Sequence, residues 1–332
     1  MVDPTELRRH GLRYSSDEEP GIRRRRRGKG FGYVRDDGAA VTTEDRSRIA
    51  ALVVPPAWTD VWICPDARGH VQATGRDARG RKQHRYHAEW RRMRDNRKFG
   101  DLAEFGTALS ELRGTIDGDL RRPGFDHRKM SALVLALMDA TLIRVGNDEY
   151  ARTNGTFGLT TLTRRHVVMA SGEVRFRFVG KGGVRHEVDI DDRRLARLVR
   201  RCHELGGREL FSFRDESGEI VRVDSADAND YLRSVVGDAH SVKTFRTWGA
   251  SALAVDRLAR DPDLAEDRRT MIAVIDLVAA RLGNTRAVAR SSYLHPGLPD
   301  WVADGRLRSA WERARTTATM ERSERALLAL LG

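Results

Sequence analysis

The stretch VRFRFVGKGGVRHEVDI at residues 174–190 indicates the fold class. Apolar and charged residues alternate on both sides of a glycine-rich centre, which is the pattern of two antiparallel strands joined by a tight turn. We therefore predict a β-hairpin with Lys181 at its tip. Longer apolar periods follow this hairpin and predict helices at 225–237, 242–259, 265–282, 286–292 and 306–330. The region is expected to be mainly helical with one hairpin.

The residues that precede this region have a different pattern. Short apolar runs at 61–63 and 70–73 are separated by a turn and predict strands. Five arginines at 23–27 precede a hairpin turn that we expect at 36–38. Two interpretations of the arginine run stay open: a localisation signal, or an edge strand that faces phosphates.

The change of pattern near residue 98 predicts an α+β protein of two domains. A small β-rich N-terminal domain would span 1–98, and a larger, mainly helical domain with the hairpin would span 99–332. The length of 332 residues agrees, because a domain usually takes about 150 residues.

The composition excludes several classes of protein. Hydrophobic residues make up 40% and charged residues 33% of the chain, which is a soluble globular balance. No stretch approaches the roughly 18 apolar residues of a membrane helix, and residues 1–20 do not look like a signal peptide. Cys64 and Cys202 are far apart in sequence, so neither a disulfide framework nor a thiolate zinc site is expected. This usage fits a reducing cytoplasm.

The formal net charge is +12, and its distribution points to a polyanionic partner. Residues 68–98 contain eleven Lys or Arg against three acidic residues. Side chains that can contact or stack on bases are interleaved with these charges, among them Gln83, His84 and Tyr86. We therefore expect a nucleic-acid-binding surface here, with a merely solvated basic face as the alternative.

Common cofactor motifs are missing. Gly28-Lys29-Gly30 and Gly180-Lys181-Gly182 lack the upstream glycine and the following Ser or Thr of a phosphate-binding loop, so ATP use is not expected. There is no His-Glu-x-x-His helix, and local spacing gives His84 and His87 no third ligand. The expected cofactor set is therefore none, neither metal nor nucleotide.

Three cations and one tyrosine stand out by their context. Arg144 falls inside an apolar helical period at 129–152, and burying a guanidinium without an anion is costly. Arg246 lies at the start of a predicted helix, where backbone N–H groups favour anions. Tyr293 follows a helix break at 283–285. Taken singly, each has a structural explanation: a helical Arg paired with a carboxylate, a solubilising Lys181, a packed Tyr.

The order and context of these segments resemble the successive active-site segments of type IB DNA topoisomerases, of the compact poxvirus-like branch that is also found in bacteria. The matching segments are Ile143-Arg144-Val145-Gly146, Phe178-Val179-Gly180-Lys181, Phe245-Arg246-Thr247-Trp248-Gly249, Gly283-Asn284-Thr285 and Ser292-Tyr293. A DNA-contacting segment of the same branch resembles residues 75–86. The resemblance covers nearly the whole chain.

The resemblance implies a role for each residue. Tyr293 would attack a backbone phosphodiester, form a 3′-phosphotyrosyl link and expel a 5′-hydroxyl. Arg144 and Arg246 would hold the non-bridging oxygens, and Lys181 would protonate the leaving oxygen. Asn284 occupies a position where many relatives carry His and some carry Asn, and would donate to a non-bridging oxygen. The implied activity is relaxation of supercoiled duplex DNA, without ATP or metal, by strand cleavage, rotation and religation.

The resemblance also implies DNA contacts and a cellular setting. His84 replaces a tyrosine of the relatives, and Lys243 matches a lysine near the phosphate site. The residues expected to contact DNA are Arg81, Lys82, Gln83, His84, Tyr86, Tyr150 and Lys243. The domain at 1–98 would clamp the duplex and the domain at 99–332 would be catalytic. The chain is expected to act on double-stranded DNA as a cytoplasmic, nucleoid-associated monomer.

Two other functions are weighed against this one. Tyrosine recombinases share the Arg, Lys, Arg and Tyr chemistry on a related catalytic domain, but they usually show His-x-x-Arg at the second arginine. Here that position is Lys243, and His240 is out of register. The second alternative is a basic architectural DNA-binding protein in which Tyr293 is structural.

Overall fold

The computed structural model describes residues 3–170, 173–260 and 268–332. The chain forms two compact units, Met1–Lys98 and Phe99–Gly332, and each is described by itself. Within the described ranges, no helix has the length and apolar character needed to cross a bilayer.

The first unit is built on a five-stranded antiparallel sheet with the strand order β2-β1-β3-β4-β5. Its strands are β1 (Ile22–Arg27), β2 (Gly30–Arg35), β3 (Thr59–Ile63), β4 (Val71–Arg76) and β5 (Lys82–Tyr86). Its helices are α1 (Pro4–Arg9), α2 (Thr43–Ala51) and α3 (Ala88–Gly100), which continues past the boundary of the unit. The predicted strands at 61–63 and 70–73 correspond to β3 and β4.

The arginine run forms β1, but its hairpin differs from the prediction. β1 and β2 are joined at Gly28-Lys29, where Gly28 has φ +54°, so the hairpin does not reverse at 36–38 as predicted. A turn is present at 36–38, but it follows the end of β2. β1 also pairs with β3 and is not an edge strand, so that interpretation of the run is wrong as well. The reason is Ile22, which is fully buried in the core and draws the start of the run into the middle of the sheet.

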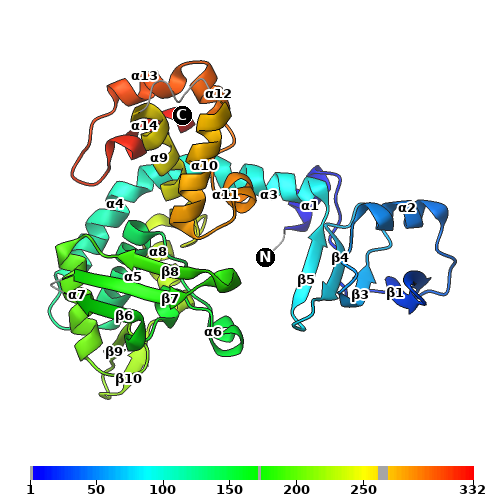
Figure 1. The fold of residues 1–332 in the computed structure, drawn as a ribbon, viewed down its shortest axis with the longest axis horizontal. Helices are drawn as coiled ribbons and strands as arrows, with labels where there is room; N and C mark the ends of the chain where they lie inside the picture. The colour runs from blue at the N-terminus through cyan, green and yellow to red at the C-terminus, as the bar shows by residue number, and fades with distance from the viewer. Residues whose placement is uncertain (1–2, 171–172, 261–267) are drawn as a thin grey trace. The chain divides into compact units, whose positions relative to one another are not determined.

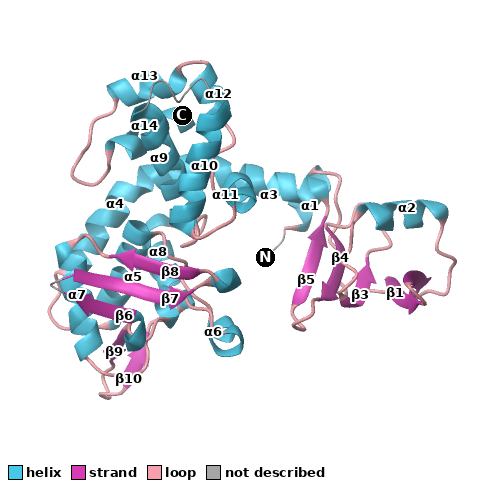
Figure 2. Cartoon of the chain, viewed as in Figure 1, coloured by secondary structure: helices cyan, strands magenta, loops and turns pink. Residues whose placement is uncertain are grey.

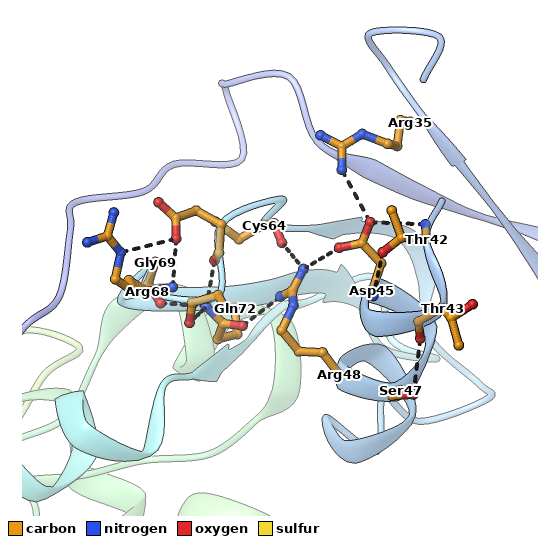
Figure 3. A network of polar contacts seen from close by, with 12 residues as sticks. Arg35, Thr42, Thr43, Asp45, Ser47, Arg48, Cys64, Arg68, Gly69 and Gln72 are labelled. Atoms are coloured by element: carbon orange, nitrogen blue, oxygen red, sulfur yellow. Dashed lines mark hydrogen bonds and ion pairs between the residues drawn. The ribbon is translucent and has the colours of Figure 1, made fainter. Parts of the chain in front are cut away.

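A polar network holds α2 on this sheet (Figure 3). The Arg48 guanidinium donates to Gln72 Oε1 at 2.8 Å and to the Cys64 carbonyl at 2.7 Å. The Gln72 amide in turn donates to the carbonyls of Asp66, Ala67 and Gly69. At the other end of the helix, Thr42 and Asp45 form a capping box. One side chain of α2 therefore fixes the turn between β3 and β4.

Figure 2 shows that helices predominate in the second unit and that strands form a smaller part of it. Together with the β-rich first unit, this confirms the predicted α+β class. The strands are β6 (Val167–Ala170), β7 (Glu173–Val179), β8 (Arg185–Asp189), β9 (Ser212–Arg214) and β10 (Ile220–Arg222). β6, β7 and β8 form one antiparallel sheet, while β9 pairs with β10. The predicted hairpin is β7–β8, with Lys181 at the tip.

Figure 1 labels the helices of the second unit from α4 to α14. Those of the second unit are α4 (Leu102–Leu120), α5 (His127–Thr141), α6 (Asp148–Asn154), α7 (Arg193–Glu204), α8 (Ser225–Val236), α9 (Thr244–Arg260), α10 (Arg268–Leu282), α11 (Arg286–Ser292), α12 (Leu298–Ala303), α13 (Arg306–Arg313) and α14 (Arg322–Leu331). The predicted helices at 225–237, 242–259 and 286–292 are α8, α9 and α11.

The two remaining predicted helices, at 265–282 and 306–330, differ in outcome. The helix predicted at 265–282 corresponds to α10, and residues 265–267 lie outside the described residues. The single helix predicted at 306–330 is wrong, because α13 and α14 are separate. Between them Thr317 and Met320 exchange hydrogen bonds, which closes a turn and prevents a continuous helix.

The helix predicted at 129–152 ends earlier than expected. α5 stops at Thr141, and Leu142 takes a left-handed conformation with φ 57°. Arg144 therefore lies in a non-helical segment that leads to α6, and its predicted helical setting is wrong. The apolar pattern continues because Leu142 and Ile143 stay buried after the helix has ended.

A charged network fixes α9 within the second unit. Arg113 on α4 is paired with Asp139 on α5 and with Glu324 on α14, each at 2.7 Å. Glu324 also accepts a hydrogen bond from the Trp248 indole of α9 at 2.9 Å. Trp248 packs on Gly106 of α4, where a Cβ would collide with the indole ring. These contacts hold the helix that begins with Arg246.

Candidate active site

Arg246 is the most deeply placed cation of the site. It lies in the first turn of α9 and only 4% of the residue is exposed. Its guanidinium donates to the Leu142 carbonyl and, at 2.9 Å, to the Leu282 carbonyl. Burial, followed by the nearby charge of Arg144, lowers the pKa of Arg246 to about 10. The group therefore stays charged at neutral pH, with carbonyls rather than a carboxylate as partners.

Arg144 is held by backbone contacts. Its carbonyl accepts from Leu159 N–H at 2.9 Å, and a Cβ on Gly158 would lie 2.6 Å from Gly146 N. This close approach requires glycine at position 158. The Arg144 guanidinium donates to Asn284 Oδ1, which joins the segment after α5 to the segment after α10.

Tyr293 directly follows α11 and is partly buried against the hydrophobic core of the second unit. The centre of the Arg246 guanidinium lies 5.0 Å from the centroid of the Tyr293 ring. The backbone of Tyr293 is held by Ser251, a fully buried residue of α9. The Ser251 hydroxyl donates to the Tyr293 carbonyl and accepts from His295 N–H, both at 3.2 Å. Sequence reasoning did not identify Ser251, because a serine inside a helix gives no signal of its own.

Two donors in this cluster are buried without a hydrogen-bond partner among the described residues: Arg246 Nε and Asn284 Nδ2. An unsatisfied buried donor costs about 1–3 kcal/mol. Because Asn284 Oδ1 accepts from Arg144, the amide nitrogen is the group that remains for an external acceptor. The structure therefore brings Arg144, Arg246, Asn284 and Tyr293 together around unsatisfied donors that suit an anion.

Lys181 lies at the tip of the β7–β8 hairpin, directly after Gly180, which packs against His186. It is exposed and lies in a short turn of 3₁₀ helix, with Gly182 at φ 80°. Among the described residues, its side chain forms no hydrogen bond or ion pair with the four clustered residues or with any acid. Its position is thus set by how the hairpin is held.

His186 on β8 connects the hairpin to the cluster. Its ring stacks on Phe178 of β7, with 4.9 Å between centroids, and packs against Gly180 and Gly283. Burial lowers the pKa of His186, and Arg144 and Arg246 lower it further. Sequence reasoning did not single out this residue. The signal was the strand alternation itself, which places a histidine among the apolar residues of β8.

The expected DNA-contacting residues of the first unit are divided between the two faces of β5, an edge strand. Lys82, His84 and Tyr86 alternate along it and are exposed. The rings of His84 and Tyr86 are stacked at 5.6 Å and nearly parallel, at 7°. Gln83 lies on the other face and donates to Asp77 at 3.0 Å. The exposed face thus presents one cation and a pair of flat rings.

The remaining residues expected to contact DNA include ion-paired cations of the first unit and exposed side chains of the second. Arg81 forms an ion pair with Asp77 at 2.6 Å, and Lys82 forms one with Asp17 at 2.8 Å. Tyr150 on α6 is 44% exposed. Lys243 is exposed immediately before α9, and its carbonyl accepts from Arg246 N–H.

His240 does not take part in the cluster. It is buried, its ring lies against Phe105 of α4, and its nearest carboxylate is Glu104 at 3.7 Å. Across the described ranges, no three His, Cys, Asp or Glu side chains gather in the way a metal site requires.

Comparison with known families accounts for most of the chain. A family model described as the catalytic core of eukaryotic DNA topoisomerase I matches residues 87–297. A second, described as the N-terminal domain of bacterial DNA topoisomerase IB, matches residues 30–77. The first match contains all five residues that were selected as candidate catalytic groups.

Individual proteins show the same relationship. The DNA topoisomerase 1B of Acanthamoeba polyphaga mimivirus is 32% identical over 285 residues, which cover 82% of this chain and 85% of the viral protein. The DNA topoisomerase 1B of vaccinia virus (strain Copenhagen) is 21% identical over 262 residues, covering 76% and 80% of the two chains. The DNA topoisomerase I of monkeypox virus is similar to the same extent.

Proposed function

Because the chain belongs to the type IB DNA topoisomerases, we propose that it relaxes supercoiled duplex DNA through a 3′-phosphotyrosyl intermediate, without ATP or a metal ion. The observation that carries the mechanism is the pair of unsatisfied buried donors, Arg246 Nε and Asn284 Nδ2, beside the ring of Tyr293. A phosphate with its non-bridging oxygens among these groups would accept hydrogen bonds from both.

Tyr293 is the proposed nucleophile. Its phenolic oxygen attacks the phosphorus of one strand, a new P–O bond forms to the tyrosine, and the bond to the 5′-oxygen breaks. The positive charge of Arg246 next to the ring would stabilise the negative charge that develops on the phenolic oxygen in the transition state. One phosphodiester is exchanged for another, so the reaction needs no energy from ATP and is reversed by the 5′-hydroxyl.

Arg144, Arg246 and Asn284 are proposed to stabilise the charge that develops on the non-bridging oxygens. The two arginines supply charge-assisted hydrogen bonds, which are about twice as strong as neutral ones. Each preorganised donor of this kind is worth about 10²–10³ in rate. Since two guanidinium groups provide the positive charge, the proposal needs no metal ion for this step.

Lys181 is proposed to act as the general acid. An alkoxide is a poor leaving group, and protonation of the leaving oxygen by a positioned acid contributes about 10²–10⁴-fold. The Lys181 ammonium gives one proton to the 5′-oxygen, and the phenol of Tyr293 releases one to solvent. A proton from solvent then restores the Lys181 ammonium, so the proton count balances over the cleavage step. The glycine-flanked hairpin tip suits a group that must reach the bound strand.

Both units are proposed to bind double-stranded DNA, with the protein acting as a monomer on the nucleoid. Residues 1–98 would clamp the duplex through the exposed face of β5, where Lys82, His84 and Tyr86 lie. Residues 99–332 would hold the scissile phosphate, with Lys243 and Tyr150 near it and Arg81 and Gln83 at the margin of the β5 surface. Phosphate contacts would make this binding weaker as salt rises.

The nucleophile is tested by substitution. In Tyr293→Phe we expect DNA affinity to stay near that of the wild type while the covalent complex trapped by denaturant disappears, because only the attacking oxygen is lost. Tyr14 is an exposed tyrosine stacked on His70, and Tyr14→Phe serves as the matched control that should still form the covalent complex. Trapping that survives in Tyr293→Phe would overturn the assignment.

The same protein preparation tests the reaction class. Monomeric protein is expected to relax both positively and negatively supercoiled plasmid in the presence of a chelator and without ATP. Strand exchange between two specific sites would instead indicate recombination.

A further inference from the structure

His186 lies where three segments of the second unit meet. Its ring is stacked on Phe178, at an interplanar angle of 11°. A Cβ added to Gly180 would lie 2.6 Å from His186 Nε2, and one added to Gly283 would lie 2.9 Å from the same atom. Both distances are too short for a real Cβ, so the ring fills space that exists only because these two positions are glycine.

The two glycines are the immediate neighbours of proposed catalytic groups. Gly180 precedes Lys181, and Gly283 precedes Asn284. The ring of His186 therefore spans the gap between the tip of the β7–β8 hairpin and the segment after α10. The Lys181 side chain is exposed and has no hydrogen-bond or ion-pair partner among the described residues, so the position of the tip depends on contacts such as this one.

We propose that His186 is a positioning residue, whose ring sets the hairpin tip against Gly283 so that Lys181 reaches the leaving 5′-oxygen. The proposal rests on the general-acid role given to Lys181 above. His186 contacts no reacting atom in this account: it acts through Gly180 and Gly283.

The electrostatics agree with a packing role. The charges of Arg144 and Arg246 disfavour a third cation beside them, and the pKa of His186 is lowered by burial and by both arginines. The lowered pKa favours the neutral imidazole, which fills its place without repelling the two phosphate-binding groups. A lysine or arginine of similar length would bring a positive charge against them.

The experiment compares two DNA substrates that differ in one bridging atom. Replacing the leaving 5′-oxygen by sulfur removes the need for a general acid, because a thiol has a pKa of about 8.5 and its anion leaves readily. On the oxygen substrate, His186→Ala is expected to slow single-turnover cleavage about 10²-fold, the effect of displacing a reacting group by about 1 Å. On the sulfur substrate, its rate should return to near that of the wild type.

Three further variants test whether His186 acts through Lys181. Lys181→Ala should show the same recovery on sulfur, and the double variant with His186→Ala should be no slower than Lys181→Ala alone. Glu187→Ala is the matched control, since Glu187 is an exposed neighbour on the same strand that pairs with Arg177 at the surface. Its cleavage rate should stay within about threefold of the wild type on both substrates, as surface pairs contribute little.

A second route avoids removing the ring. Gly180 has φ −95°, which alanine adopts without strain, so Gly180→Ala should fold and push the ring aside through its new Cβ. We expect a cleavage defect on the oxygen substrate that sulfur again relieves. This variant keeps the test decisive if His186→Ala fails to fold.

The outcomes separate the two levels of the proposal. If Lys181→Ala is not rescued by sulfur, the general-acid assignment fails, and the role of His186 falls with it. If Lys181→Ala is rescued but folded His186→Ala and Gly180→Ala are not, the assignment of Lys181 stands and the positioning role of His186 is wrong. If the sulfur substrate restores the cleavage rate of all three variants, both the general-acid role of Lys181 and the positioning role of His186 are supported.

Discussion

Two arginines of the second unit, Arg113 and Arg246, are both withdrawn from water, but their partners differ. Arg113 is paired with Asp139 and Glu324, each at 2.7 Å. Arg246 donates to two backbone carbonyls and lies against the Tyr293 side chain, and among the described residues it forms no ion pair with a carboxylate. The first charge is neutralised inside the fold, whereas the second is not. The comparison indicates that charge compensation separates a structural arginine from one that serves an external anion.

The same contrast appears in the pKa directions. Arg113 and its two acids form a closed set, and the hydrogen bonds to Glu324 and Asp139 outweigh burial and raise the pKa of Arg113. For Arg246, burial and the charge of Arg144 prevail and lower the pKa to about 10. A phosphate bound between Arg144 and Arg246 would raise the pKa of Arg246 and would supply the negative charge that Arg246 lacks within the fold.

The largest effect on stability is expected at Arg113. Arg113→Gln leaves two acids without their cation, and breaking a buried ion pair costs about 3–5 kcal/mol. We expect a loss of about 3 kcal/mol, at the lower end of that range, because 23% of the Arg113 side chain is exposed. Urea unfolding of Arg113→Gln and of the wild type measures this loss of stability. A stability equal to that of the wild type would show that the network contributes nothing and would remove one side of the comparison.

A smaller effect is expected from pH at the same network. Burial alone would raise the pKa of Glu324, but hydrogen bonding to Arg113 outweighs it, and the pKa is lowered. A folded-state pKa below the unfolded value of about 4.3 stabilises the protein above that pH. This contribution is lost as the pH falls through the lower folded-state value.

The free energy of unfolding of the wild type and of Glu324→Gln should therefore differ most above about pH 5. The difference should shrink as the solution is acidified below about pH 4. A difference that is constant over this interval would mean that the charge of Glu324 does not contribute.

Much of the site follows from sequence, for physical reasons that can be stated. The alternation at 174–190 fixed the hairpin and placed Lys181 at its tip, because strand period and turn glycines are local signals. The start of α9 at Thr244 was also local, and it put Arg246 in the first helical turn.

What sequence missed depends on partners that are distant along the chain. The end of α5 was hidden because Leu142 and Ile143 remain buried after the backbone has left the helix. The contact between His186 and Gly283 joins residues almost one hundred positions apart, and the Ser251 hydroxyl meets Tyr293 only after α9 and α11 have packed. Periodicity reports burial, and it does not report which element supplies the partner.

The central claim is that Arg246 is kept charged and uncompensated in order to hold the scissile phosphate. The direct measurement is single-turnover cleavage by Arg246→Gln, with its urea unfolding in parallel. We predict cleavage slowed by about 10²–10³-fold and a free energy of unfolding within about 1 kcal/mol of the wild type, because a desolvated charge is removed without leaving an acid behind. Cleavage at the wild-type rate by a protein that has lost about 3 kcal/mol of stability would contradict it and make Arg246 a structural residue like Arg113.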